Sequence, residues 1–144
     1  MRFEKSCGAV IFAVEDGQTR YLIERMRGGH VSLCKGHVEA GETEHETARR
    51  EIMEETALSV RFLDGFRETI SYSPYEGCMK EVVFFLAQAE HTRTVAQECE
   101  VAQIFWLTES EALGALTYAD DRRVLSSAAR HLEQIEKNNG RGSI

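Results

Sequence analysis

The sequence lacks any apolar run close to the roughly 20 residues that a helix needs to cross a bilayer. It therefore predicts no transmembrane segment and no membrane partner. The apolar stretch that ends at Val14 is not followed by the small-residue cleavage site of a secretion signal, so it is interpreted as a first strand. We expect a cytoplasmic protein on these grounds. Internal repeats and low-complexity segments are also missing, and 144 residues suit one domain.

Positive charge is in short supply. Lysine and arginine number 17 against 24 acidic residues, which gives a net charge of −7. A protein that binds polymeric nucleic acid needs a basic face, so such a partner is disfavoured. The cysteines are too far apart in the sequence for a zinc knuckle or a dithiol redox motif. All four thiols are expected to be reduced and mostly structural: Cys7, Cys34, Cys78 and Cys99.

The pattern of apolar and turn-forming residues predicts one mixed α/β domain over residues 1–137, with a frayed tail at 138–144. Strands are predicted at 6–14, 21–25, 58–72 with a bend at Gly65, 82–87 and 104–107. A glycine-containing loop is predicted at 35–42, and helices at 43–56, 109–115 and 119–136. The order strands, helix, strands, helices indicates a mixed sheet with helices on both faces.

The most acidic segment carries the chemical signal. Positions 39 to 55 hold seven glutamates and two arginines, a local charge of −5. In a helix, Glu51, Glu54 and Glu55 project from one side, where like charges repel one another. The simpler reading is a solvated acidic face. A divalent cation is the alternative, because Mg²⁺ prefers carboxylate oxygens, keeps water and binds substrate phosphates. Such an ion activates water at a phosphoryl group.

The loop before this helix suits the same chemistry. Gly36 allows backbone conformations that other residues resist, so its carbonyl can turn toward a metal ion. Glu42 is within reach of Arg50, which also precedes Glu54 by four residues and can pair with it. His37 is interpreted as a group that structures the loop rather than as a general base.

These residues form a motif at fixed spacings: Gly36, five residues, Glu42, seven residues, and then Arg50-Glu51-Ile52-Met53-Glu54-Glu55. The motif resembles the Nudix box of the Nudix hydrolase family of MutT-like proteins. It departs from the family pattern at Ala57, where the box usually has a glycine that forms a left-handed helix cap. Alanine there removes no ligand and is expected to cost about 1 kcal/mol of cap stability.

The resemblance implies a Nudix-type α/β/α sandwich with a mixed central sheet, and metal-dependent attack of water on a phosphoanhydride bond. In this family a glutamate six residues before a tryptophan often adds a metal ligand; Glu100 precedes Trp106 by six, and Glu98 is the nearby alternative. Mg²⁺ is the expected cofactor and Mn²⁺ the alternative, since both suit oxygen ligands. The implied metal ligands are Gly36, Glu51, Glu54, Glu55 and Glu100, and the implied catalytic residues are Arg50, Glu51 and Glu54. Which glutamate is the general base stays open.

Outside the box the chain looks most similar to the asymmetric diadenosine tetraphosphate hydrolases, at residues 7–12, 35–39 and 65–68. This likeness implies a small nucleotide substrate, diadenosine tetraphosphate, and its cleavage to ATP and AMP. Cationic groups stabilise a transferred phosphoryl group, and an aromatic hairpin follows the box in that subfamily. The implied substrate contacts are therefore Arg25, Lys35 and Lys80 for phosphate, and Tyr72 and Phe84 for a base.

The chain departs from that subfamily at three positions. Val31 and Cys34 occupy the places of its usual tryptophan and proline, and Phe84 that of a base-stacking tyrosine. Two alternatives therefore stay open. One is a Nudix enzyme for oxidised nucleoside triphosphates, ADP-ribose or RNA 5′ ends. The other is a Nudix-fold module that senses a nucleotide without cleaving it, although the intact glutamates of the box argue against it. The sequence predicts no oligomeric state.

Overall fold

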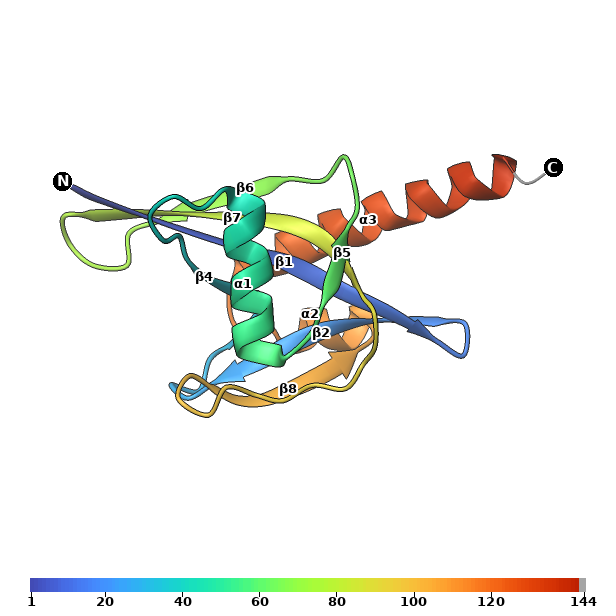
Figure 1. Cartoon of the computed structure of the whole chain (residues 1–144), viewed down its shortest axis with the longest axis horizontal. Helices are drawn as coiled ribbons and strands as arrows, with labels where there is room; N and C mark the ends of the chain where they lie inside the picture. Colours follow the sequence, from blue (N-terminus) through green and yellow to red (C-terminus); the bar gives the residue numbers. More distant parts are fainter. Residues whose placement is uncertain (143–144) are drawn as a thin grey trace.

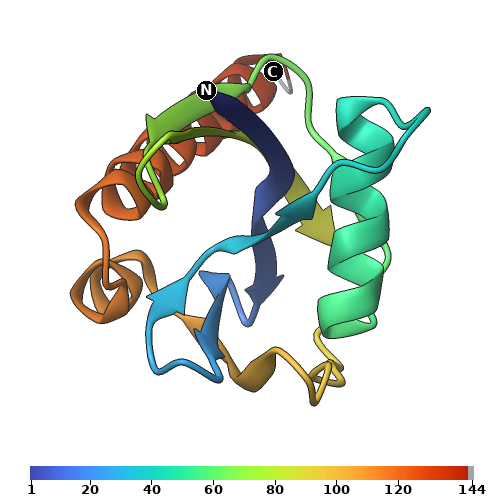
Figure 2. The ribbon, with the colours of Figure 1, turned by 90° about the vertical axis from the view of Figure 1, so that its left-hand side faces the viewer.

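The computed structural model describes residues 1–142, in which a mixed β-sheet lies between α1 on one face and α2 and α3 on the other (Figures 1 and 2). The strands are β1 (Arg2–Glu15), β2 (Gln18–Met26), β3 (Val31–Ser32), β4 (Cys34–His37), β5 (Val60–Phe62), β6 (Glu68–Tyr72), β7 (Cys78–Ala89) and β8 (Val101–Leu107). The helices are α1 (Glu44–Thr56), α2 (Glu109–Ala115) and α3 (Ala119–Gly142). Over the described residues, no helix is both long enough and apolar enough to span a bilayer.

The long first strand organises the sheet. One side of β1 pairs in parallel with β7, which in turn pairs with β5 and β6. The other side of β1 serves two antiparallel partners: Ser6 to Ala9 pair with β4, and Phe12 to Glu15 pair with β2. Because β4 branches from the same edge as β2, the sheet opens beside α1. This opening places β4 next to the acidic helix (Figure 2).

Alternation along β1 supplies the two halves of the core. Val10 and Phe12 face α3, where they join a buried cluster that includes Leu125. Ile11 faces α1 and packs in a second buried cluster with Ile52 of that helix. Successive side chains of a strand point to opposite faces, so a strand covered by helices on both sides is apolar at nearly every position. This explains the continuous apolar run that the sequence shows in β1.

The predicted fold is confirmed as a mixed sheet between helices, with three local differences. Residues 35–37 belong to β4 rather than to a loop, because their backbone pairs with β1. The segment 58–72 forms two strands, β5 and β6, with a turn at Gly65, whose φ is 87°. Helix α3 continues through positions 138–142, which were expected to fray. No proline interrupts it, and extending an existing helix costs little. Residues 143 and 144 of the expected tail lie outside the described residues.

The pairing of β1 with β4 depends on the missing side chain of Gly8. A Cβ atom at this position would lie 1.9 Å from the backbone oxygen of Cys34. We expect Gly8→Ala to lower the free energy of unfolding by about 2–4 kcal/mol, because backbone rather than a flexible side chain must move. Urea unfolding measures the change. The control is Gly114→Ala in α2, where an added Cβ meets nothing within 4 Å and alanine favours the helix. Equal losses for the two variants would contradict the steric argument.

Candidate active site

Two caps fix the position of α1 and hence the direction of its carboxylates. At its start, the hydroxyl of Thr43 accepts a hydrogen bond from the backbone of Glu46, while the Glu46 side chain accepts one from the backbone of Thr43. The predicted capping box is therefore present. At its end, Ala57 adopts the left-handed conformation with φ 63° and ψ 21°, and its N–H donates to Met53.

The left-handed backbone conformation of Ala57 leads to a prediction about stability. A non-glycine residue in this conformation carries a steric cost, which glycine avoids. Ala57→Gly is therefore expected to raise the free energy of unfolding by about 1 kcal/mol. Chemical denaturation tests this, with Ala48→Gly inside the same helix as the opposite control, since glycine destabilises a helix interior. A loss of stability in Ala57→Gly would count against the cap assignment.

Arg50 connects the loop to the carboxylates of α1. Its Nε and Nη2 donate to the two carboxylate oxygens of Glu42 at 2.7 and 3.0 Å, and Nη2 also donates to the carbonyl of His37 at 2.9 Å. Its Nη1 donates to Glu51 at 2.8 Å and to Glu54 at 3.2 Å. The hydrogen bonds from Arg50 hold the pKa of Glu42 at about 2. The predicted Arg50 pairs with Glu42 and Glu54 are confirmed, and one guanidinium orients both Glu51 and Glu54.

Gly36 brings β4 into contact with the helix. A Cβ atom on Gly36 would lie 2.0 Å from the carboxylate carbon of Glu51. Only glycine lets the strand backbone lie this close to that carboxylate, which is itself mostly buried. The structure thus brings together two of the metal ligands that the sequence predicted.

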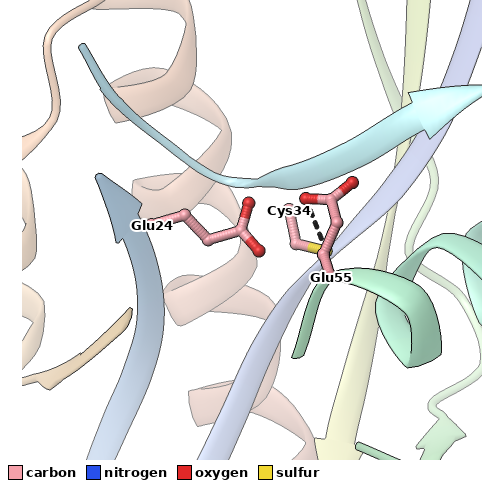
Figure 3. Close-up of side chains that lie close together, drawn as sticks. All are labelled: Glu24, Cys34 and Glu55. Atoms are coloured by element: carbon pink, nitrogen blue, oxygen red, sulfur yellow. Dashed lines mark hydrogen bonds between the residues drawn. The ribbon is translucent and has the colours of Figure 1, made fainter. Parts of the chain in front are cut away.

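A second group of side chains is more deeply buried. Glu55 of α1, Glu24 of β2 and Cys34 of β4 point toward one another from three elements (Figure 3). Their donor atoms all lie within 4.8 Å of one another, and the Cys34 Sγ is 3.7 Å from the Glu55 Oε1. Neither carboxylate oxygen of Glu24 has a hydrogen-bond partner among the described residues.

Burial makes the three side chains of this group harder to ionise, as their raised pKa values show. Burial, reinforced by Glu24, raises the pKa of Glu55 to about 11. Burial also raises the pKa of Glu24 and of the Cys34 thiol. Buried charge of one sign is expensive unless it is paired or coordinates a metal ion. Unpartnered carboxylate oxygens in such a place therefore fit a divalent cation, which supplies the missing positive charge.

Sequence reasoning missed Glu24 and Cys34 as members of the site. A usable signal existed for Glu24: it follows Leu22 by two residues, so it occupies an inward-facing position of a buried strand, where a carboxylate is out of place. The predicted ligand Glu100 lies in the turn before β8 and is exposed. Its charge contributes to the raised pKa of Glu24, which places it near the group without making it a member.

A cavity of about 410 Å³ lies on the opposite side of β4. Consecutive strand residues face opposite ways, so Lys35 lines this cavity while Gly36 contacts Glu51. Two aromatic rings line the cavity, Tyr72 and Tyr118, together with a buried carboxyl group at Asp121. The full lining is His30, Ser32, Lys35, Ile70, Tyr72, Ser73, Pro74, Tyr118, Asp120 and Asp121.

The other predicted substrate contacts are more scattered. Lys80 pairs with Tyr72 across β6 and β7 but does not line the cavity, and burial lowers the pKa of Lys80. Arg25 donates from Nη2 to Gln103 of β8 at 2.9 Å. Phe84 requires a correction: it is 0% exposed in the core between the sheet and α3, so it has no surface to offer a base. Both faces of β7 are covered, which buries its aromatic residues whichever way they point.

Comparison with known proteins assigns this architecture to a family. A family model described as NUDIX domain matches residues 5–128. Among curated relatives, MutT4 of Mycobacterium tuberculosis (strain CDC 1551 / Oshkosh) is 31% identical over 144 residues, which cover 94% of this chain and 58% of the relative. The chain thus spans little more than half the length of MutT4. The asymmetrical bis(5′-nucleosyl)-tetraphosphatase of Sus scrofa is 28% identical over 140 residues, covering 89% of this chain and 95% of the relative.

Solved structures of other proteins have the same fold. A crystal structure of a C. elegans Ap4A hydrolase binary complex superposes with a TM-score of 0.83 at 25% identity, covering 91% of this chain and 98% of that chain. The NUDIX domain of Shewanella oneidensis NrtR, solved with ADP ribose, has a TM-score of 0.74 at 18% identity, over 92% and 89% of the two chains. The second likeness concerns the fold alone.

Proposed function

We propose that this chain, which belongs to the NUDIX family, is a pyrophosphohydrolase of nucleoside polyphosphates whose substrate is a dinucleoside polyphosphate, diadenosine tetraphosphate. The observation that carries this proposal is the cavity behind β4. Its volume of about 410 Å³ falls in the usual range for small-molecule sites. Its tyrosines suit stacking on a nucleobase. Lys35 lines this cavity on the face of β4 opposite Gly36, so its ammonium group is available to a phosphate of a substrate held there.

The similarity to proteins of the same size supports the same substrate. The chain covers nearly all of a tetraphosphatase from Sus scrofa and of an Ap4A hydrolase from C. elegans. We assign the products as ATP and AMP. Water adds to one phosphorus, the anhydride bond to the bridging oxygen breaks, and that oxygen leaves with the other nucleotide.

Divalent metal ions are general to this family, and the glutamates on one side of α1 suit them. We propose Mg²⁺, held by the carbonyl of Gly36 and by Glu51, Glu54 and Glu55, with Glu100 nearby. When bound, the ion stabilises charge on the phosphoryl oxygens and lowers the pKa of a bound water molecule.

The protein's own contribution is positioning. Arg50 holds the carboxylates of Glu51 and Glu54 in one orientation, and Glu42 holds Arg50 in turn. Prior orientation of charged groups is the main source of rate enhancement in phosphoryl transfer. Lys35 contributes a cation on the cavity side of β4, and Tyr72 contributes an aromatic surface for a base.

The test is product analysis with a matched variant. The purified protein is incubated with diadenosine tetraphosphate and Mg²⁺, and the products are separated by chromatography. We expect equal amounts of ATP and AMP. Glu54→Gln keeps the side-chain shape but removes the charge, and should lower the rate by about 100-fold or more. Glu90→Gln, an exposed glutamate at the end of β7, should leave the rate unchanged.

Two outcomes would replace the proposed substrate. Turnover of nucleoside triphosphates, ADP-ribose or capped RNA, but not of diadenosine tetraphosphate, would keep the hydrolase and change its specificity. Tight nucleotide binding without turnover of any of these compounds would instead indicate a sensor module.

A further inference from the structure

We propose that Glu24, Cys34 and Glu55 form a buried site for a borderline transition-metal ion, Zn²⁺, through one thiolate and two carboxylates. This site is distinct in its donor set from the oxygen-only magnesium centre along α1, with which it shares Glu55. The proposal does not depend on which nucleotide the enzyme cleaves.

The distances already suit a shared ion. Zn–S bonds are about 2.3 Å and Zn–O bonds about 2.0–2.2 Å, so sulfur and oxygen ligands of a tetrahedral zinc ion lie about 3.6 Å apart. The Sγ of Cys34 and the Oε1 of Glu55 are 3.7 Å apart, and all three donor atoms lie within 4.8 Å of one another. The ligands come from β2, β4 and α1, which holds them rigidly (Figure 3).

A second observation points independently to a ligand. Glu24 is 0% exposed, and both of its carboxylate oxygens lack a hydrogen-bond partner among the described residues. Buried polar groups in native proteins are nearly always satisfied, and an exception calls for a specific explanation. The carboxylate of Glu24 points toward Cys34 and Glu55 rather than toward solvent (Figure 3). A cation bound between the three side chains satisfies it.

The thiol decides the class of metal. Mg²⁺ binds oxygen ligands, whereas thiolate ligands select softer ions such as Zn²⁺. Three protein ligands leave a fourth tetrahedral position for water, as in other zinc sites that are not closed. Within residues 1–142, no other cysteine belongs to a group of three metal-ligating side chains. Cys99 is an exposed free thiol and provides a matched control.

The experiment uses Co²⁺ as a coloured substitute for Zn²⁺. The metal-free, full-length protein is titrated with Co²⁺ under reducing conditions and its absorption is recorded. We expect one equivalent of Co²⁺ to produce an intense near-ultraviolet band from thiolate-to-metal charge transfer. Zn²⁺ should abolish this band by displacement, whereas excess Mg²⁺ should not.

Three variants complete the test. Cys34→Ser is expected to lose the charge-transfer band and Cys99→Ser to keep it. Glu24→Gln retains the thiol, so it should keep a band while binding Zn²⁺ at least about tenfold more weakly, as measured by competition with a chromophoric chelator. Circular dichroism checks that each variant is folded. A wild-type protein without the band, a band that persists in Cys34→Ser, or undiminished Zn²⁺ affinity in Glu24→Gln would overturn the proposal.

Discussion

Glu55→Gln should lower the rate of hydrolysis by about 100-fold or more and, at the same time, make the metal-free protein more stable. The loss of activity is expected because Glu55 is one of the proposed metal ligands. The gain in stability follows from burial: Glu55 is 1% exposed and lies beside the buried, unpartnered Glu24. Near neutral pH the folded chain can bury Glu55 only by holding a proton that an unfolded glutamate releases, and a glutamine of the same shape removes this cost.

The gain should depend on pH in a defined direction. An unfolded glutamate has a pKa near 4.3, and burial raises the pKa of Glu55 to about 11 in the folded chain. Between these values the folded state holds a proton that the unfolded state releases, so stability falls as pH rises. The advantage of Glu55→Gln is therefore small near pH 4.5 and grows above it, to at most about 4 kcal/mol at neutral pH.

Urea unfolding in the presence of a chelator, at pH 5 and at pH 8, measures this difference. The matched control is Glu54→Gln, whose side chain is 47% exposed; it should lose activity without gaining stability. Added Mg²⁺ should stabilise the wild type and have less effect on Glu55→Gln, since a ligand stabilises only the state that binds it. A metal-free Glu55→Gln protein no more stable than the wild type at pH 8 would contradict the argument.

Gly36→Ala should reduce turnover by about 100-fold while costing less than about 1 kcal/mol of stability. The added Cβ would meet the carboxylate end of Glu51 at 2.0 Å. That end is the tip of a flexible side chain, so the fold can adjust by moving it. Moving it takes Glu51 out of the place where Arg50 holds it.

The comparison with Gly8→Ala makes this prediction specific. Both glycines lie where β1 pairs with β4, but the Cβ of Gly8 would meet backbone and that of Gly36 would meet a side chain. One variant should therefore lose stability and the other activity. Steady-state kinetics and urea unfolding of both proteins check the pattern. Normal turnover in Gly36→Ala would show that the position of Glu51 is not critical.

Features that depend on residues close together in the sequence were predicted correctly, whereas features that depend on contacts between distant segments were missed. The caps of α1 and the pairing of Arg50 with Glu42 depend on residues close in the chain, and both were predicted correctly. Residues 35–37 were assigned to a loop because their strand exists only through pairing with β1, a contact between distant parts of the chain. Glu24 was missed for the same reason, since its position beside Glu55 depends on how β2 lies against α1.

The predicted base-stacking role of Phe84 was wrong for a different reason. A run of apolar residues does not reveal which faces of a strand are covered, and the likeness to related hydrolases suggested a base-stacking role. The structure covers β7 on both sides, so neither Phe84 nor Phe85 is exposed. The aromatic residues that line the cavity come instead from the end of β6 and from the segment before α3, namely Tyr72 and Tyr118.

Successive side chains of the four-residue strand β4 point to opposite faces, so the strand contributes to two different surroundings. Cys34 and Gly36 face Glu55 and Glu51 of α1, while Lys35 between them faces the cavity. If the cavity holds the nucleotide as proposed, mutations on its side should change substrate preference without altering the carboxylates of α1. A slip of β4 by a single residue would exchange the two sides. Specificity in this fold can thus diversify residue by residue, whereas its chemistry depends on the strand register being kept.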